Sequence, residues 1–253
     1  MIELVDVTVG FDGKPVLRNI SCTFPEGRTT LVVGASGSGK SVLMRTIEGL
    51  IRPVSGEVWI DGERIDTHNA LHLRQTRRKL SMLFQGAALL DSMNVYQNVA
   101  LPLVEHTRLE PQEIRRQVRE KLALVGLHNV EEAMPSALSG GMRKRVGLAR
   151  AIILEPRYII YDEPTTGLDP VIAEEIVRLI QKLRDSLEVT TIVVTHDLEC
   201  IDRLAERVVM IGEEVKWFEG DYQEFTRSDD KHIRAFLYGY GGRSEPAAGT
   251  DSD

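Results

Sequence analysis

The chain has 253 residues, of which 42% are hydrophobic and 27% are charged, so it can bury a full core within one compact domain. A net charge of −7 argues against a protein held mainly by nucleic-acid phosphates or an anionic membrane surface, and the basic runs Arg74 to Lys79 and Arg143 to Arg145 are expected to be solvated faces. Cys22 and Cys200 have no CxxC partner, so neither a disulfide framework nor a zinc site is predicted. No stretch approaches the roughly 18 apolar residues of a membrane helix, so no transmembrane segment is predicted.

Short β-rich runs separated by turn residues open the chain. Strands are predicted over residues 2–9, 16–24, 30–33, 56–62 and 80–85. The run 30–33 is continuously apolar and leads into glycines, as a buried parallel strand that feeds a helix does. In the helix that follows, Leu43, Ile47 and Leu50 keep a helical spacing, and Pro53 to Gly56 is expected to end it.

The pattern becomes helical from about Asn94 to Leu154. The helices predicted there cover residues 98–104, a stretch that begins at Pro111 and carries Ile114, Val118, Leu122 and Val125 on one face, and residues 142–154. A strand at 158–162, an amphipathic helix through 172–183 and a strand at 190–195 follow. The sequence therefore predicts an α/β fold in which a helical insert, about residues 86–155, interrupts alternating strands and helices.

The string GASGSGKS fits the phosphate-loop pattern and lies where its mechanism requires, between an apolar strand and a helix. Its residues are Gly34, Ala35, Ser36, Gly37, Ser38, Gly39, Lys40 and Ser41. Glycines allow backbone N–H groups to converge on phosphates, and the helix start adds its positive dipole end. Lys40 is expected to reach the β- and γ-phosphates, and Ser41 to offer its hydroxyl to Mg²⁺.

Two carboxylates end the predicted strand 158–162. Because consecutive strand residues point to opposite sides, Asp162 and Glu163 can have different roles. Asp162 is the candidate that orders Mg²⁺, and Glu163 is the candidate base that polarises the attacking water. The alternative, an acidic pair in solvent, is disfavoured by the phosphate loop in the same chain.

Three further residues each have two interpretations. His196 follows a strand and could reach the γ-phosphate, although a lone strand-end histidine is more often a surface or capping residue. Gln85 could place its amide oxygen near Mg²⁺ and respond to phosphate, or be an ordinary polar residue at a strand end. Phe11 could stack on adenine, or belong to the core as most phenylalanines do.

A second glycine-rich helix start, LSGGM, follows at Leu138 to Met142. Ser139, Gly140 and Gly141 form an N-cap signature with exposed amides, to which an anion would bind favourably. The chain already has a complete phosphate loop. The simplest use of this helix start is therefore the γ-phosphate of a nucleotide bound to a second copy.

Together these motifs resemble the ATP-binding cassette family over about residues 1–225. The resemblance rests on GASGSGKS, Gln85, LSGGM, YIIYDEP, Gly167 to Asp169 and His196, in the family's order. It implies a phosphate-loop NTPase core of RecA type, with an N-terminal antiparallel β subdomain and an inserted α-helical subdomain. It also implies ATP and Mg²⁺ as ligands and a head-to-tail homodimer around two ATP molecules.

The resemblance assigns a role to each site residue. Glu163 is the catalytic base, His196 the switch and Gln85 the coupling glutamine, while Ser41, Gln85 and Asp162 hold Mg²⁺. Phe11 stacks on adenine where many members have tyrosine. Asp169 lies at the dimer seam, and Ser139 to Gly141 close over the ATP of the other copy.

LSGGMRKRVGLARAI and the segment Phe84 to Leu103 are similar to the ATPases of MCE-type lipid transporters, including those that maintain bacterial outer-membrane lipid asymmetry. The resemblance implies transmembrane permease subunits and an MCE-type lipid-binding protein as partners, on the cytoplasmic face of the inner membrane. An importer ATPase for amino acids or another small polar solute is the alternative. An ATP-binding cassette protein acting on ribosomes or DNA would usually carry two cassettes, and another phosphate-loop enzyme would not explain LSGGM.

The C-terminal extension, residues 226–253, follows the cassette. Phe236, Leu237, Tyr238 and Tyr240 form an aromatic and apolar cluster that either docks on a partner subunit or folds back on its own domain. From about residue 240 the composition predicts disorder.

Overall fold

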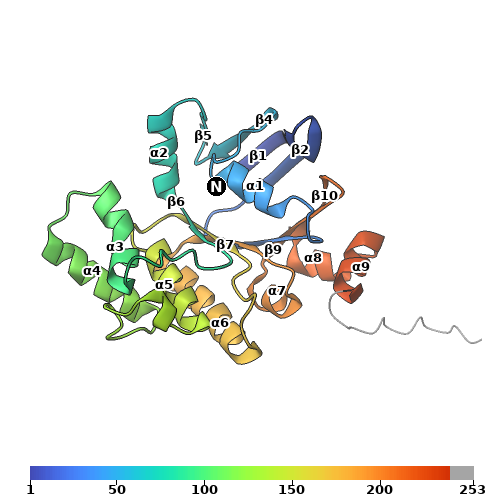
Figure 1. Cartoon of the computed structure of the whole chain (residues 1–253). Coiled ribbons are helices and arrows are strands. Elements are labelled where there is room, and N and C mark those ends of the chain that lie inside the picture. The colour runs from blue at the N-terminus through green and yellow to red at the C-terminus, as the bar shows by residue number, and fades with distance from the viewer. Residues whose placement is uncertain (240–253) are drawn as a thin grey trace, which may run out of the picture.

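A computed structural model describes residues 1–239, except for the side chains of residues 198 and 199. These residues form two β-sheets and the helices around them (Figure 1). An antiparallel sheet, of order β2-β1-β4-β5, contains β1 (Ile2–Phe11), β2 (Lys14–Phe24), β4 (Ser55–Ile60) and β5 (Glu63–Arg64). A second sheet, of order β10-β9-β3-β8-β7-β6, contains β3 (Thr29–Val33), β6 (Leu80–Leu83), β7 (Tyr158–Asp162), β8 (Thr190–Val194), β9 (Arg207–Gly212) and β10 (Val215–Asp221).

The second sheet is parallel except at one edge, where β10 pairs antiparallel with β9. Its central strands are buried on both faces, which explains their unbroken apolar sequences. Because side chains alternate along a strand, Val32 and Ile160 enter one core cluster while Leu31 and Tyr161 enter the other. The parallel sheet thus separates two cores.

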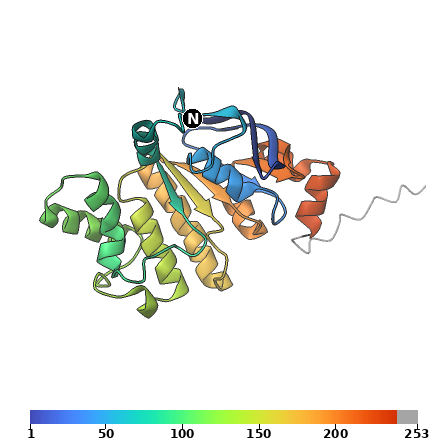
Figure 2. The ribbon, with the colours of Figure 1, turned by 45° about the horizontal axis from the view of Figure 1, so that its top comes forward.

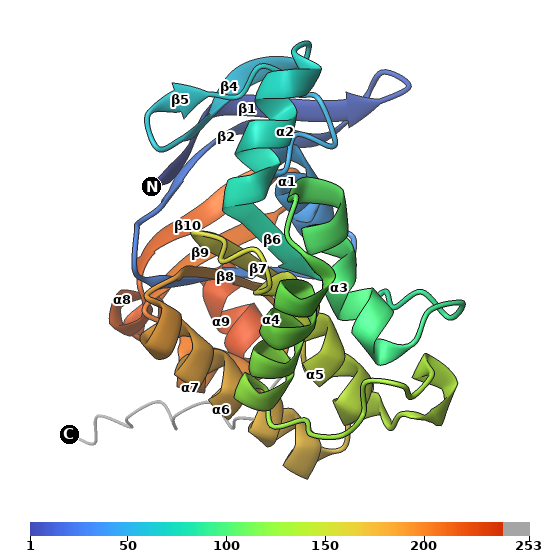
Figure 3. The ribbon, with the colours of Figure 1, turned by 90° about the vertical axis from the view of Figure 1, so that its left-hand side faces the viewer.

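Helix α1 (Lys40–Ile47) packs between the two sheets, where Leu43, Met44 and Ile47 share a core with both (Figure 2). The other helices of the described residues are α2 (Ala70–Lys79), α3 (Val95–His106), α4 (Pro111–Leu124), the 3₁₀ turn η1 (Pro135–Ala137), α5 (Gly140–Ala151), α6 (Pro170–Leu187), α7 (Leu198–Leu204), α8 (Tyr222–Arg227) and α9 (Lys231–Gly239). Figure 3 shows α4, α5, α6 and α7 on the side of the parallel sheet away from the antiparallel sheet.

Hydrogen bonds join the antiparallel sheet to β10 and to the turn that precedes it. The N–H of Arg18 on β2 donates to the carbonyl oxygen of Glu214 at 2.6 Å. The N–H of Thr23 on the same strand donates to Oε1 of Glu219 at 2.9 Å. The two sheets therefore form one continuous unit at this edge.

The helices differ from the sequence prediction in several places. Helix α1 ends at Ile47 because Gly49 has a φ of +65°, and Leu50 is 54% exposed. Helix α5 covers Gly140–Ala151 and begins at the Ser139 cap, earlier than predicted. Helix α2 was not predicted, since Thr76 is its one buried residue and its sequence lacks an apolar periodicity.

The C-terminal cluster folds back on its own domain as far as the described residues extend. Ile233, Phe236 and Leu237 of α9 are 1%, 4% and 6% exposed. The Phe236 ring lies edge-on to Phe225 with centroids 6.4 Å apart, and both rings belong to the core under the parallel sheet. Tyr240 and the tail predicted to be disordered lie outside the described residues.

Candidate nucleotide site

The carboxyl ends of four adjacent parallel strands meet at one edge of the sheet. The phosphate loop follows β3, His196 follows β8, Glu163 follows β7 and Gln85 follows β6. In open α/β sheets this edge is where ligands bind. A cavity of about 410 Å³ opens there, lined by Ser36, Gly37, Lys40, Ser41, Gln85, Asp162, Glu163, Val194 and His196.

Two glycines of the phosphate loop are required by its close packing. Gly34 has a φ of +149°, and a Cβ atom on it would lie 2.1 Å from the carbonyl oxygen of Ile211. Gly39 has a φ of +98°, and a Cβ atom there would lie 2.7 Å from Cδ2 of Leu17. Larger residues would push the loop away from β9 and β2.

Lys40 is buried at the mouth of this loop, with 8% of its surface exposed. Its Nζ atom donates to the carbonyl oxygens of Gly34 at 2.9 Å and Ala35 at 2.8 Å. Burial lowers the pKa of Lys40, and the nearby carboxylates of Glu163 and Asp162 oppose that shift. The cavity thus places one ammonium opposite two carboxylates, a charge pattern suited to a metal-bound polyphosphate.

Glu163 is held in a fixed orientation at the cavity wall. Its backbone is left-handed, with a φ of +49°, and its N–H donates to the carbonyl oxygen of Val194 at 2.8 Å. Its Oε1 atom lies 2.7 Å from Nδ1 of His196, and its Oε2 accepts from Oγ1 of Thr166 at 3.2 Å. The carboxylate is 14% exposed, enough to meet a water in the cavity.

Asp162, Ser41 and Gln85 bring carboxylate, hydroxyl and amide oxygens to the same cavity. Burial raises the pKa of Asp162, as does the neighbouring Glu163. Among the side chains that the structure describes, no cluster of three or more His, Cys, Asp or Glu residues could bind a metal. Mg²⁺ suits such a sparse site, because it is usually bound by one or two carboxylates together with substrate phosphates.

The second glycine-rich motif lies outside the cavity lining. Ser139 caps α5, and its Oγ accepts the N–H of Met142 at 3.2 Å. Gly140 and Gly141 pack on the start of α6, where a Cβ atom on Gly141 would lie 2.6 Å from Cγ2 of Ile172. Their lack of side chains therefore serves packing within this chain as well as leaving the helix start accessible.

Phe11 and Asp169 also lie outside that lining. Phe11 ends β1 and is 49% exposed, so it does not belong to the core. Asp169 caps α6 by accepting the N–H of Ile172 at 3.1 Å. Of the predicted site residues, the structure places Ser36, Gly37, Lys40, Ser41, Gln85, Asp162, Glu163 and His196 in the cavity lining, and the others lie outside it.

The prediction that Arg143 to Arg145 form a solvated face is wrong for Lys144, which is 4% exposed. Its Nζ donates to the carbonyl oxygens of Gln85 and, at 3.2 Å, of Glu163. Charge counting missed this residue because a basic run on a helix points in several directions. The sequence did contain a signal for its burial. Most neighbours of Lys144 on this helix are apolar or small, and such a helix is buried on most of its faces.

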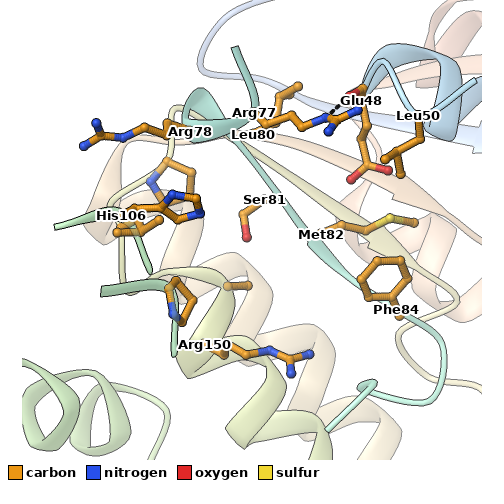
Figure 4. A pocket seen from close by; sticks show the side chains of 14 residues that line it. Glu48, Leu50, Arg77, Arg78, Leu80, Ser81, Met82, Phe84, His106 and Arg150 are labelled. Carbon is orange, nitrogen blue, oxygen red and sulfur yellow. Dashed lines mark hydrogen bonds between the residues drawn. The ribbon is translucent and has the colours of Figure 1, made fainter. Parts of the chain in front are cut away.

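A second hollow of about 250 Å³ lies beside the cavity, between α2, β6, α3 and α5 (Figure 4). Leu80, Met82 and Phe84 form its apolar floor, and Phe84 is 40% exposed. The lining also includes the charged or basic side chains Glu48, Arg77, Arg78, His106 and Arg150. We call this hollow the lateral groove.

Comparisons with known proteins agree with this geometry. Residues 17–166 match the family described as ABC transporter. The chain is 40% identical over 239 residues to the intermembrane phospholipid transport system ATP-binding protein MlaF of Escherichia coli (strain K12), covering 94% of this chain and 89% of that protein. It is 39% identical over 238 residues to the probable ribonucleotide transport ATP-binding protein mkl of Mycobacterium bovis, covering 94% and 66%.

Solved cassettes share the fold. CbiO1 of Clostridium perfringens, part of the ABC transporter complex cbiONQ, has a TM-score of 0.82 and 28% identity over 94% of each chain. The ATP-binding cassette MJ0796, in a dimeric post-hydrolysis state bound to ADP and Pi, has a TM-score of 0.79 and 31% identity, covering 87% of this chain and 98% of that one.

Proposed function

Because this chain belongs to the ABC transporter family and is an ATPase of that family, we propose that its ATP hydrolysis powers phospholipid movement between the inner and outer membranes of a bacterium. The observation that supports this substrate class is the 40% identity to MlaF over 94% of the chain. The predicted importer for amino acids or small polar solutes has no comparable support. The name of the mycobacterial relatives makes a ribonucleotide the competing cargo.

In the proposed reaction, Glu163 accepts a proton from the water that attacks the γ-phosphate, and His196 holds its carboxylate in place. Lys40 and the backbone N–H groups of the phosphate loop bind the phosphates and stabilise the charge that develops on them. Ser41, Gln85 and Asp162 would hold Mg²⁺, which supplies charge neutralisation on the phosphate oxygens. Phe11 would stack on the adenine from the exposed end of β1.

We propose that two copies pair head to tail around two ATP molecules. The position of Ser139, Gly140 and Gly141 outside their own cavity supports this arrangement. Their helix start would contact the γ-phosphate bound to the other copy, and Asp169 would lie at the seam. The relative MJ0796 has been solved as a dimer bound to ADP and Pi.

The lateral groove is the proposed docking place for a transmembrane permease subunit. Its apolar floor and basic rim fit a short helix with apolar and acidic side chains. None of the helices in the described residues could span a bilayer. Through the permease partner, the chain would work at the cytoplasmic face of the inner membrane. An MCE-type lipid-binding protein completes the proposed complex.

The test is purification with native membrane partners in mild detergent, followed by identification of bound lipids and subunits by mass spectrometry. Phospholipid that co-purifies with a permease and an MCE protein is the expected result. A matched preparation from cells that lack the tagged chain controls for lipid carried by detergent. Recovery with a ribonucleotide-binding or amino-acid-binding partner, and without the MCE protein, would overturn the lipid assignment.

A further inference from the structure

One face of α5 is attached to the segment Gln85 to Ala88, which connects β6 to the helices that follow. Lys144, Gly147 and Arg150 repeat every three residues along this face. Lys144 Nζ donates to the carbonyl oxygen of Gln85, and Arg150 donates to the carbonyl oxygens of Ala87 at 2.7 Å and Ala88 at 2.9 Å.

Gly147 allows the close approach that these bonds require. A Cβ atom on Gly147 would lie 2.8 Å from Cδ1 of Leu83 and 3.1 Å from Cβ of Ala87. The segment itself is strained, because Ala87 and Ala88 have φ values of +60° and +45°. Residues with a Cβ atom keep such a backbone only where the surroundings hold it in place. The contacts from α5 supply that restraint.

Lys144 also reaches the other side of the cavity. Its Nζ atom lies 3.2 Å from the carbonyl oxygen of Glu163, so one ammonium joins the backbones of Gln85 and Glu163. We infer that Lys144 is a positioning residue for ATP hydrolysis, holding Gln85 and Glu163 at a fixed separation and tying both to the helix that begins at Ser139. The inference rests on the proposed roles of Gln85 and Glu163 at the nucleotide.

The attachment links the two nucleotide sites of the proposed dimer. Lys144 directly follows the first turn of α5, about 6 Å along the helix axis from Gly140, the first residue of the helix. A movement of that first turn against the partner's ATP is therefore transmitted to Gln85 and Glu163 of the same copy. Arg150 also lines the lateral groove, so a permease segment bound there contacts the far end of the same attachment.

An apolar side chain cannot replace the lysine. Lys144 is almost fully buried, and removal of its ammonium takes the donor from the carbonyl oxygen of Gln85 and leaves that of Glu163 with the N–H of Thr166 at 3.3 Å. Lys144→Met keeps the length of the side chain and removes the donor. Lys144→Arg keeps a cationic donor, and Lys182→Met, on an exposed site of α6, is the matched control.

Two measurements test the inference. In nucleotide-free protein, Lys144→Met should accelerate hydrogen exchange of peptides that cover residues 84–90, with unchanged exchange in α6 and β10. In the assembled transporter its kcat should fall by about 10- to 100-fold while KM for ATP changes by less than about 3-fold, because misplacement affects chemistry more than binding. Lys144→Arg should recover part of both losses, and Lys182→Met should match the unmodified protein.

The inference would be overturned if Lys144→Met has the same kcat as the unmodified protein and the same hydrogen exchange over residues 84–90. Faster exchange throughout the domain would also overturn it, because it would indicate a general stabilising role. If Lys144→Met does not fold, Lys144→Gln, whose shorter side chain does not join the carbonyl oxygens of Gln85 and Glu163 as the lysine does, is measured in the same way. Normal hydrolysis by Glu163→Gln would instead refute the proposed function, and the nucleotide-free exchange measurement would still stand.

Discussion

Nδ1 of His196 lies 2.7 Å from Oε1 of Glu163, which joins the ends of two neighbouring parallel strands through their side chains. The imidazole is 49% exposed and the carboxylate 14% exposed, and both side chains line the cavity. Thr166 holds the other carboxylate oxygen. Glu163 is therefore oriented from both sides before any substrate binds, which is a requirement for a general base.

Glu163→Gln should retain ATP binding and reduce turnover by about 100-fold or more, since the amide cannot accept the proton of the attacking water. The variant should also accumulate as a dimer in the presence of ATP. ATPase assays and size-exclusion chromatography with ATP measure the two effects. Glu120→Gln, an exposed change on α4, is the control, and near-normal hydrolysis by Glu163→Gln would remove the proposed base.

Mixed dimers test whether a site is shared between copies. With Ser139→Arg and Lys40→Ala in one copy, both composite sites should be damaged and hydrolysis should disappear. With the same changes in opposite copies, both defects fall in one site, and more activity should remain. ATPase assays on dimers purified through two different affinity tags compare the arrangements; greater activity in the single-copy arrangement would contradict the head-to-tail model.

Glu48→Gln should stabilise the protein in a pH-dependent way. Burial raises the pKa of Glu48 from 4.5 to about 7, and its Oε2 has no hydrogen-bond partner among the described residues. The folded protein therefore binds this proton more tightly than the unfolded chain, and ionisation costs stability as the pH rises from 4.5 to about 7.

The amide removes that cost. Compared with the unmodified protein, Glu48→Gln should raise the free energy of unfolding by up to about 3 kcal/mol at pH 8 and by less than about 1 kcal/mol at pH 5. Urea unfolding at the two pH values measures it, with the exposed Glu105→Gln as the control. An equal change at both pH values would show that ionisation of Glu48 is not responsible.

Phe236→Ala tests the packing of α9 on its own domain. Removal of this buried ring from its contact with Phe225 should lower the free energy of unfolding by about 3 to 5 kcal/mol. Val54→Ala, at a side chain that is 74% exposed, should change it by less than about 0.5 kcal/mol. Equal effects in urea unfolding would mean that α9 adds no stability to the isolated domain.

The sequence predicted the parts of the site that depend on local motifs. The phosphate loop follows an apolar strand, and Asp162 and Glu163 end another; parallel strands bring such ends to the same edge, so their proximity followed from the strand pattern. The roles predicted for the remaining residues, such as Gln85 and His196, came from the family resemblance. The ABC family and the α/β fold are confirmed by the comparisons.

Other features depended on contacts between distant segments. Lys144 meets Gln85 across 59 positions of sequence, and no periodicity in either segment encodes that pairing. Helix α2 is held by its Asn69 cap and buries little, so an apolar pattern could not reveal it. The exposed position of Phe11 likewise depends on how β1 ends against β2, which composition does not determine.

The bonds from Arg18 to Glu214 and from Thr23 to Glu219 also limit how the protein can move. They fasten the sheet that carries Phe11 to the sheet that carries the phosphate loop, so both ends of a bound nucleotide would rest on a single rigid platform. The chain leaves this platform for helices α3 to α5 through the strained Ala87 and Ala88, and it returns to the platform between α5 and β7. After hydrolysis, helices α3 to α5 would therefore tilt relative to the two sheets, and the two sheets would not move relative to each other.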